Sequence, residues 1–474
     1  MNGTFVGNHP PDVTVPHPGR SVTDVVPPPA LSFRSRMAGS TRADVRRLGD
    51  REVVLVESHF GAHLGALQAA DGVRIAAAAD AARTMRLPLV LILASSGADI
   101  GEGLPALHGW GTAARAVVRC SGIVPILVAV DGPAISGPAL LLGLADQVVM
   151  TAAAYAYVSG PNMVKAFTGE EVSPAELGGA WVHARDSGTA IDVVPDREAA
   201  LALLTELLGY LPDHCDDLPA RLATDDPIDR PTPEAGDLLP VGATGSYDIR
   251  KVIACLADDA AVLELRAGWA PNLVTALTSF GGRPVGLIAN QPQSVAGTLD
   301  IPASQKGARF VAFCDAFNLP LITLVDTPGF YPGKDLEWRG MIRHGAQLAF
   351  AYARATVPRI GVTLRKSYGG AYIVMDSRFM GNDLMLAWPS AEIAVMGARQ
   401  AAEILMRRGS AEEREEFVAS YESRLLNPYI AAGRGTVDAV IDPADTRREL
   451  CHAIEALETK QERLVGRRHD NTPL

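Results

Sequence analysis

The strongest constraint on this chain is that its two halves repeat the same order of short segments. The first half has a Leu-Pro step, a later proline and a Ser-Gly pair at Pro88, Pro125 and Ser136-Gly137. The second half has a Leu-Pro step, a later proline and a Gly-Gly pair at Pro320, Pro358 and Gly369-Gly370. The two prolines are 37 residues apart in the first half and 38 in the second, and each residue pair starts 11 residues after the later proline. Because the matches occur in one order, we expect two copies of one folding unit.

Within each copy, short β-branched apolar runs alternate with Ala-rich stretches of helical length. In the first copy we expect strands over 53–57, 87–94 and 123–130 and helices over 72–86 and 104–120. In the second copy we expect strands over 285–290, 319–326 and 359–364 and helices over 304–318 and 339–355. This alternation is typical of repeated β-α units, so the fold class is predicted to be α/β.

The chain is too long for one hydrophobic core, and its composition suggests where it divides. Residues 1–36 are rich in proline without a hydrophobic period, which predicts a flexible tail. A first domain is expected over 37–210 and a second over 247–474. The Asp- and Pro-rich residues 211–246 between them are typical of a linker.

Charge and composition exclude several classes of function. The formal net charge is −11 and no long Lys/Arg run occurs, which argues against a nucleic-acid partner. The apolar runs are far shorter than the ~20 residues that span a bilayer, and the N-terminus lacks a signal pattern, so we expect no membrane partner and a cytoplasmic protein. The five cysteines are widely spaced without a Cys-x-x-Cys pair, which predicts buried reduced thiols and no metal site.

Two glycine-containing loops follow apolar runs in the first copy. Residues 95–100 read Ser-Ser-Gly-Ala-Asp-Ile, and residues 134–140 read Ala-Ile-Ser-Gly-Pro-Ala-Leu. These loops resemble those of the crotonase superfamily, in which each loop presents one backbone N–H to the thioester oxygen of an acyl-CoA. The resemblance implies that Ala98 and Gly137 are the catalytic donors and that Ser136 and Gly160 bind the substrate. Two fixed donors beside a helix N-terminus would stabilise a developing enolate oxygen.

The first copy lacks the acid and base side chains of a hydratase. Crotonase hydratases carry glutamates on and just beyond the glycine-rich helix, whereas this chain has Leu140 and then Val158-Ser159-Gly160. An oxyanion hole without a side-chain base suits reactions that form an enolate by gaining or losing carbon dioxide, because the second substrate can supply the base.

The second copy carries a longer series of motifs. They are Gly-Thr-Leu-Asp-Ile at 297–301, Val-Asp-Thr-Pro-Gly-Phe at 325–330, Arg-Lys-Ser-Tyr-Gly-Gly-Ala-Tyr at 365–372 and Ala-Trp-Pro-Ser-Ala-Glu-Ile-Ala at 387–394. Together they resemble the carboxyltransferase β subunits of biotin-dependent acyl-CoA carboxylases, the propionyl-CoA and acetyl-CoA carboxylase family of the crotonase superfamily. The resemblance covers nearly all of residues 247–405. It implies two tandem crotonase-like domains, each a ββα superhelix.

The resemblance also implies which residues of the second copy hold biotin. Gly369, Gly370 and Ala371 would bind it, and the N–H groups of Gly370 and Ala371 would act in catalysis by polarising the ureido oxygen of carboxybiotin. Biotin N1′ would then take the α-proton of the acyl-CoA. Gly329 and Ile373 would line the substrate site, with the apolar Ile373 suiting short saturated acyl groups. Asp326 and His344 lie in motif loops and are expected to brace them.

Partners follow from the same resemblance. No Ala-Met-Lys-Met carrier motif is present, so biotin must be attached to a separate chain. The expected partners are a biotin carboxylase and a biotin carboxyl carrier subunit, besides further copies of this chain in a dimer to hexamer. No metal cofactor is expected, and the second substrate is a CoA thioester.

The first copy departs from the family pattern at Ser96, Asp99, Ser136 and Pro138. Proline has no N–H, so a hole built from the positions that match Gly370 and Ala371 would lack one donor at Pro138, whereas a hole built from Ala98 and Gly137 would be complete. Three readings stay open: a carboxyltransferase acting on acetyl- or propionyl-CoA, a decarboxylase or transcarboxylase with altered acceptor specificity, and a non-catalytic partner subunit in a mixed carboxylase complex.

Overall fold

A computed structural model describes residues 39–240 and 245–460, together with residues 462, 464, 466 and 471–473. The tail expected over 1–36 lies outside the described residues. Below, the first repeat means the described residues up to 210, and the second repeat means those from 247 onward.

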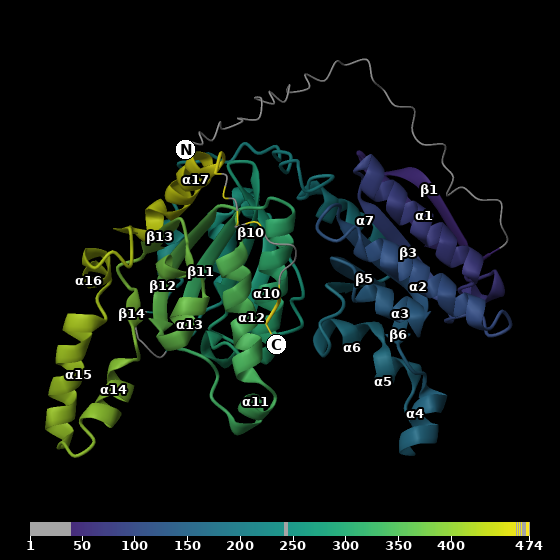
Figure 1. The fold of residues 1–474 in the computed structure, drawn as a ribbon. Coiled ribbons are helices and arrows are strands. Elements are labelled where there is room, and N and C mark those ends of the chain that lie inside the picture. The colour runs from purple at the N-terminus through teal and green to yellow at the C-terminus, as the bar shows by residue number, and fades with distance from the viewer. Residues whose placement is uncertain are drawn as a thin grey trace, which may run out of the picture. The chain divides into compact units, whose positions relative to one another are not determined.

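The first repeat is built on one mainly parallel sheet (Figure 1). Its strand order is β1-β2-β3-β4-β5-β7, and β6 pairs with the end of β4. β1 and β2 form an antiparallel hairpin, while the pairs from β2 to β7 are parallel. The bounds are β1 Thr41–Leu48, β2 Arg51–Ser58, β3 Leu89–Ser95, β4 Ile126–Ile135, β5 Gln147–Thr151, β6 Tyr155–Tyr157 and β7 Asp192–Val194.

The second repeat builds the same sheet again. Its order is β8-β9-β10-β11-β12-β13-β15, with β14 paired to the end of β12. The hairpin is here formed by β9 and β10, and the strands from β10 to β15 are parallel. The bounds are β8 Leu263–Glu264, β9 Leu273–Phe280, β10 Arg283–Asn290, β11 Leu321–Thr327, β12 Arg359–Tyr368, β13 Leu384–Ala387, β14 Glu392–Ala394 and β15 Ala439–Val440. Apart from the added antiparallel strand β8, the order from β9 to β15 repeats that from β1 to β7, which confirms the prediction of two α/β copies.

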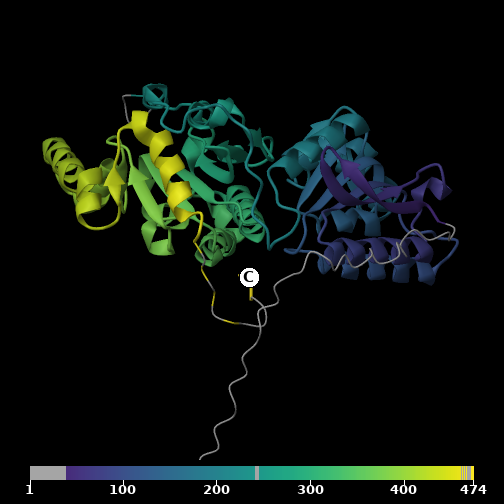
Figure 2. The same ribbon diagram turned by 90° about the horizontal axis from the view of Figure 1, so that it is seen from above.

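Helices follow the strands in the same sequence in both repeats. In each repeat two long helices pack together beside the sheet, α1 with α2 and α10 with α12 (Figures 1 and 2). The helices of the first repeat are α1 Ala69–Met85, α2 Leu104–Val118, α3 Gly137–Leu142, α4 Pro161–Thr168, α5 Pro174–Gly178, α6 Ala180–Arg185 and α7 Arg197–Gly209. Those that follow are α8 Pro233–Asp237, α9 Ile249–Leu256, α10 Ile301–Ala316, α11 Lys334–Trp338, α12 Met341–Arg354, α13 Gly369–Val374, α14 Ala398–Leu405, α15 Ala411–Leu425, α16 Pro428–Gly433 and α17 Thr446–Leu457.

Three of the expected helices begin at other residues than the sequence indicated, and α1, expected from residue 72, begins at Ala69. α10 starts at Ile301, because the side chain of Asp300 caps it by accepting from the N–H of Ala303 at 2.9 Å, and proline is tolerated in the first turn. The helix expected over 339–355 is α12 alone, since Gly340 adopts a left-handed backbone and separates it from α11.

The residues expected to form a linker make specific contacts with the second repeat. The N–H of Leu222 donates to the carbonyl of Gly282 at 2.7 Å, and that of Thr232 donates to the carbonyl of Ala444 at 2.8 Å. The segment also contains α8. The domain boundaries at 210 and 247 stay a prediction.

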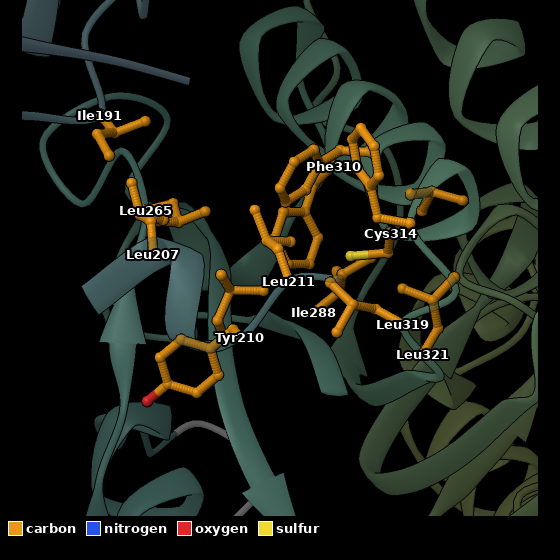
Figure 3. Close-up of a cluster of buried hydrophobic side chains, with 14 of the residues drawn as sticks. Ile191, Leu207, Tyr210, Leu211, Leu265, Ile288, Phe310, Cys314, Leu319 and Leu321 are labelled. Atoms are coloured by element: carbon orange, nitrogen blue, oxygen red, sulfur yellow. The ribbon is translucent and has the colours of Figure 1, made fainter. Parts of the chain in front are cut away.

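One apolar cluster is shared by the two repeats. It contains Leu207 at the end of the first repeat, Leu211 directly after that repeat, and Phe310 and Leu321 of the second, all buried. Figure 3 shows the side chain of Leu211 lying between those of Leu207 and Phe310. Polar contacts join the repeats as well, because Arg309 on α10 forms an ion pair with the buried Asp146 before β5 at 3.1 Å.

Lys306 of α10 is a buried cation near this junction. Its Nζ donates to the carbonyl oxygens of Arg266 and Trp269, both at 2.9 Å, so the ammonium holds the turn before β9. Burial lowers the pKa of Lys306 to about 7; Glu264 opposes this shift and Arg266 adds to it. Lysine in the unfolded chain has a pKa near 10.5, so folding disfavours the charged form.

This shift predicts a pH-dependent contribution of Lys306 to stability. Between pH 7 and the unfolded value the unfolded chain binds the lysine proton more tightly, so native stability should rise with pH in that window, by at most about 1.4 kcal/mol per pH unit. We compare the unfolding free energy of the native chain with that of Lys306→Met by urea unfolding. The native value minus the variant value should increase from pH 7 to pH 9. Lys251→Met, at an exposed lysine of α9, is the control. If the unfolding free energies of Lys306→Met and Lys251→Met depend on pH with the same slope, the interpretation is wrong.

Candidate active site

The carboxyl ends of β3 and β4 bring two loops of the first repeat together. The pairing shifts register after Leu93, and Ser95 then lies opposite Ala134. As a result Gly97 packs against the end of β4: a Cβ atom there would lie 3.4 Å from the carbonyl oxygen of Ile135. The structure therefore places the loop that contains Ala98 beside the start of α3, where Gly137 lies.

The Ala98 loop is held by hydrogen bonds on both sides. The N–H of Leu67 donates to the carbonyl of Gly97 at 2.7 Å, and the N–H of Asp99 donates to the carbonyl of Leu67 at 3.0 Å. Within the described residues no hydrogen bond engages the N–H of Ala98. Gly137 is the first residue of α3, where a helix leaves its N–H groups without intrahelical acceptors. Both donors implied by the sequence are thus available for a ligand.

Asp99 is part of this brace. Its carboxylate accepts from Nε2 of Gln68 at 2.8 Å and from the N–H of Gly101 at 2.9 Å. These hydrogen bonds, that of Gln68 first, lower the pKa of Asp99. Asp99 departs from the family pattern, and its side chain helps to hold this loop.

Ser136 and Gly369 occupy matching positions in the two repeats and share a positive φ. Their φ angles are 60° and 59°, a region that side chains other than glycine rarely adopt. The N–H of Ser136 donates to the carbonyl of Tyr157 at 2.9 Å, which ties α3 to β6. The Ser136 side chain is exposed and makes no capping hydrogen bond. Gly160 follows β6 and caps α4.

Trp110 of α2 lies directly against Gly137. Its Nε1 donates to the carbonyl oxygen of Gly137 at 2.7 Å, and a Cβ on Gly137 would be only 2.5 Å from Cδ1 of the indole. Trp110 is not among the residues that sequence reasoning selected, since it lies 27 residues before Gly137 and belongs to no motif. Pro138, buried in the first turn of α3, occupies a position that proline tolerates.

The second repeat forms the corresponding site at the ends of β11 and β12. The register shifts after Val325 so that Thr327 lies opposite Ser367, and a Cβ on Gly370 would be 3.4 Å from the ring of Phe330. Beside Gly370 is a cavity of about 480 Å³. Its lining residues are Phe330, Glu337, Met341, Ile342, Gly345, Ala346, Ala349, Gly370, Ile373 and Val374.

The structure brings residues expected to hold biotin together with residues expected to bind the acyl substrate. Gly370 and Ile373 line the cavity, and Ile373 is 38% exposed. Ala371 is fully buried in the same turn of α13. Gly329 immediately precedes the cavity residue Phe330, and its carbonyl accepts from the N–H of Leu299 at 3.1 Å. Their roles in binding stay a prediction.

A buried ion pair braces the strand ends below this site. Nε of Arg365 lies 3.1 Å from Oδ2 of Asp326, and Oδ1 of Asp326 accepts from the N–H of Lys366 at 3.1 Å. Burial raises the pKa of Asp326, and Arg365 opposes the shift. His344 also has polar neighbours: its Nδ1 lies 3.2 Å from Nε2 of Gln305 and 3.2 Å from Oε1 of Gln347. Neither Asp326 nor His344 lines the cavity.

The cysteines match the sequence expectation only in part. All five cysteines are free, but only Cys120, Cys314 and Cys451 are buried, while Cys215 and Cys255 are half-buried. In the part of the chain that the structure describes, no three His, Cys, Asp or Glu side chains are grouped to hold a metal ion. Within the same residues, no helix combines the length and apolar character needed to cross a bilayer.

Comparison with known proteins decides the family. The carboxyl transferase domain matches residues 46–472. The chain belongs to the carboxyl transferase family. It is 43% identical to the methylmalonyl-CoA carboxyltransferase 12S subunit of Propionibacterium freudenreichii subsp. shermanii, an alignment that covers 81% of this chain and 75% of the relative. It is 42% identical to the propionyl-CoA carboxylase beta chain of Saccharopolyspora erythraea, over 90% of this chain and 81% of the relative.

Solved structures agree with this assignment. The transcarboxylase 12S hexamer with hydrolysed methylmalonyl-coenzyme A bound superposes with a TM-score of 0.90 at 39% identity, covering 92% of this carboxyltransferase and 85% of that chain. The expected family, crotonase-like fold and enzymatic acyl-CoA carboxyl transfer are thereby confirmed.

Ser136 predicts a stabilising substitution in the carboxyltransferase. A non-glycine residue in a sparsely populated backbone region lowers stability by about 1–3 kcal/mol. Glycine removes this strain but loses more conformational entropy on folding, which offsets part of the gain. We expect Ser136→Gly to raise the free energy of unfolding by about 1 kcal/mol in thermal or urea unfolding. Ser96→Gly, at an exposed serine outside the left-handed region, is the control and should be neutral or destabilising. Destabilisation by Ser136→Gly would refute this reading.

The Arg365–Asp326 pair predicts a large loss of stability when one partner is removed. Arg365→Leu leaves the Asp326 carboxylate buried without its cation, which should lower the unfolding free energy by about 3–5 kcal/mol. The exposed pair Arg339–Asp335 offers a matched control, because Arg339→Leu should have little effect. Similar midpoints of unfolding for the two variants would show that the buried pair does not brace the strands.

Proposed function

We propose that the chain is the carboxyltransferase subunit that moves a carboxyl group from biotin on a separate carrier chain to the α-carbon of a short-chain acyl-CoA. The observation that carries this proposal is the duplicated site. Each repeat ends two neighbouring parallel strands in glycine-containing loops and begins a short helix there, at Gly137 and at Gly369-Gly370. Two such sites suit a reaction with two substrates, each of which has an oxygen to be polarised.

The acyl-CoA half of the reaction is assigned to the first repeat. The N–H groups of Ala98 and Gly137 hold the thioester oxygen, and the helix N-terminus at Gly137 adds positive potential where the enolate charge develops. Pro138 takes no part, so its lack of an N–H does not weaken this hole. Ser136 fixes the direction of the peptide that ends in the N–H of Gly137.

The biotin half is assigned to the second repeat. The cavity beside Gly370 fits a fused apolar ring, because its volume lies within the range of small-ligand sites and nine of its ten lining residues are uncharged. The N–H groups of Gly370 and Ala371 would hold the ureido oxygen, with Gly369 supplying the required turn. Bound there, biotin would supply the carboxyl group and the basic nitrogen for the α-proton.

No side chain needs to act as acid or base in this scheme. Leu140 lies on α3 and Ile373 at the corresponding place on α13, both partly exposed and apolar. The residues of the chain therefore bind, orient and polarise, while the proton passes between the two substrates. We take a short saturated acyl group such as acetyl or propionyl as the acceptor class; Ile373, which the resemblance assigns to the acyl pocket, lies in the cavity assigned here to biotin.

Assembly and partners complete the proposal. Large apolar side chains are exposed around both sites, among them Ile100 at 94%, Ile342 at 83% and Val395 at 76%. Exposed apolar groups in such numbers favour burial between copies, and we infer a homo-oligomer from a dimer to a hexamer. A biotin carboxylase with a biotin carboxyl carrier subunit would load the biotin in the cytoplasm.

A second direction of transfer has some support. The likeness to a methylmalonyl-CoA carboxyltransferase is compatible with a reaction between biotin and two acyl-CoA substrates, without a biotin carboxylase. Dependence of turnover on a biotin carboxylase and ATP separates the two directions.

Pro138→Ala tests the identity of the first oxyanion hole. If Ala98 and Gly137 are the donors, a new N–H at position 138 should change the dissociation constants of acetyl-, propionyl- and butyryl-CoA by less than about twofold, as measured by calorimetric titration. If the donors are instead the first-repeat residues at the positions that match Gly370 and Ala371, the new N–H at 138 should raise the rate of carboxyl transfer by about 100-fold. Absence of acyl-CoA binding by the native chain would favour the non-catalytic subunit.

Gly370→Val tests the biotin site. A branched side chain at the mouth of the cavity should lower transfer of carboxyl from malonyl- or methylmalonyl-CoA to free biotin by about 100-fold or more, while acyl-CoA binding is retained. Gly433→Val, at an exposed glycine where a Cβ meets nothing within 4 Å, is the matched control. Loss of acyl-CoA binding in Gly370→Val would contradict the assignment of the two substrates to separate repeats.

A further inference from the structure

The two repeats correspond residue by residue around their helix starts. His108-Gly109-Trp110 on α2 matches His344-Gly345-Ala346 on α12, and Trp110 and Ala346 each lie eight residues before the end of their helix. Trp110 contacts Gly137, and Ala346 lines the cavity beside Gly370. The correspondence therefore holds both in sequence and in space.

The second repeat leaves the space at this position open. Ala346, Gly345 and Ala349 present only small side chains along α12, and the cavity of about 480 Å³ lies between this helix and Gly370. Because these residues carry at most one methyl group, the volume of the cavity depends on the absence of a larger side chain here.

In the first repeat an indole occupies the corresponding place. Trp110 is only half-buried, and its ring lies so close to Gly137 that a Cβ on that glycine would collide with it. Its Nε1–H also bonds the Gly137 carbonyl at 2.7 Å, which fixes the ring and the peptide relative to each other. An acyl chain whose thioester oxygen is bound by the N–H of Gly137 must start within a few bond lengths of this ring.

We propose that Trp110 determines the size of the acyl group that the first repeat accepts, by filling the space that remains open as a cavity in the second. Trp110 touches the substrate through its ring face and positions Gly137 through Nε1. The ligand class is a saturated acyl-CoA, restricted to a few carbons by the indole and extended when the indole is removed. This inference rests on the proposed assignment of acyl-CoA to the first repeat.

Three substitutions separate the two roles of the indole, which are to limit the acyl group and to position Gly137. They are Trp110→Ala, Trp110→Leu and Trp110→Phe. The assay is calorimetric titration of the full chain with acetyl-, propionyl-, butyryl-, hexanoyl- and octanoyl-CoA, together with carboxyl transfer from malonyl- or methylmalonyl-CoA to free biotin. We expect Trp110→Ala to shift the ratio of hexanoyl- to propionyl-CoA affinity by at least about tenfold, since one methylene in an apolar site is worth about 10- to 200-fold. Trp110→Leu should give a smaller shift and serves if the alanine variant does not fold.

Trp110→Phe keeps most of the ring but lacks the Nε1–H donor. It should keep the native chain-length preference and KM while kcat falls, because the peptide of Gly137 is then less well held. If the Nε1–H of Trp110 had only a structural role, Trp110→Phe would lower stability without lowering kcat at an unchanged chain-length preference.

Ala346→Trp is the matched control in the second repeat. An indole there should fill the cavity and lower transfer to free biotin by about 100-fold, with the affinities for all five acyl-CoA substrates unchanged. The proposal is overturned if folded Trp110→Ala keeps the native chain-length profile, or if Ala346→Trp rather than Trp110→Ala alters it. Failure of the native chain to bind any acyl-CoA would instead overturn the proposed function, so the two failures are distinguishable.

Discussion

The parallel pairing of β3 with β4, and of β11 with β12, is the constraint on which the rest of the site depends. Parallel strands end at the same edge of a sheet, so loops that are far apart in sequence meet there. The pairing shifts register after Leu93 and after Val325, at the strand ends from which the loops begin. The helix starts at Gly137 and Gly369 lie beside these loops, and each site forms where one pair of parallel strands ends.

Sequence reasoning could recover the alternation of strands and helices along the chain and the glycine-containing loops, because both depend on local signals. Buried parallel strands are continuous apolar runs, and a turn that needs the backbone of Gly369 tolerates few other residues. Helix starts were less accurate, since the Asp300 cap and the proline after it precede the apolar period of α10. Trp110 could not be found in this way, because its contact with Gly137 arises only when α2 packs beside α3 in the folded chain.

The departures of the first repeat from the family pattern have separate local explanations. Asp99 satisfies its carboxylate with Gln68 and the N–H of Gly101, Pro138 occupies a first-turn position, and Ser136 keeps the backbone of a glycine at some cost in strain. None of them displaces the N–H of Ala98 or Gly137. The loops thus keep their geometry while their side chains have diverged, which is the expected pattern when the backbone provides the binding groups.

The shared apolar cluster of Leu207, Leu211, Phe310 and Leu321 has a consequence for how such a duplicated chain can change. Neither repeat is an exchangeable module, because cutting the chain between them would leave one wall of a common core exposed to water on each piece. A chimera that joined one repeat to its counterpart from a relative would have to match side-chain volumes across this surface. The two copies are therefore free to diverge at their catalytic edges but bound to evolve jointly where they meet.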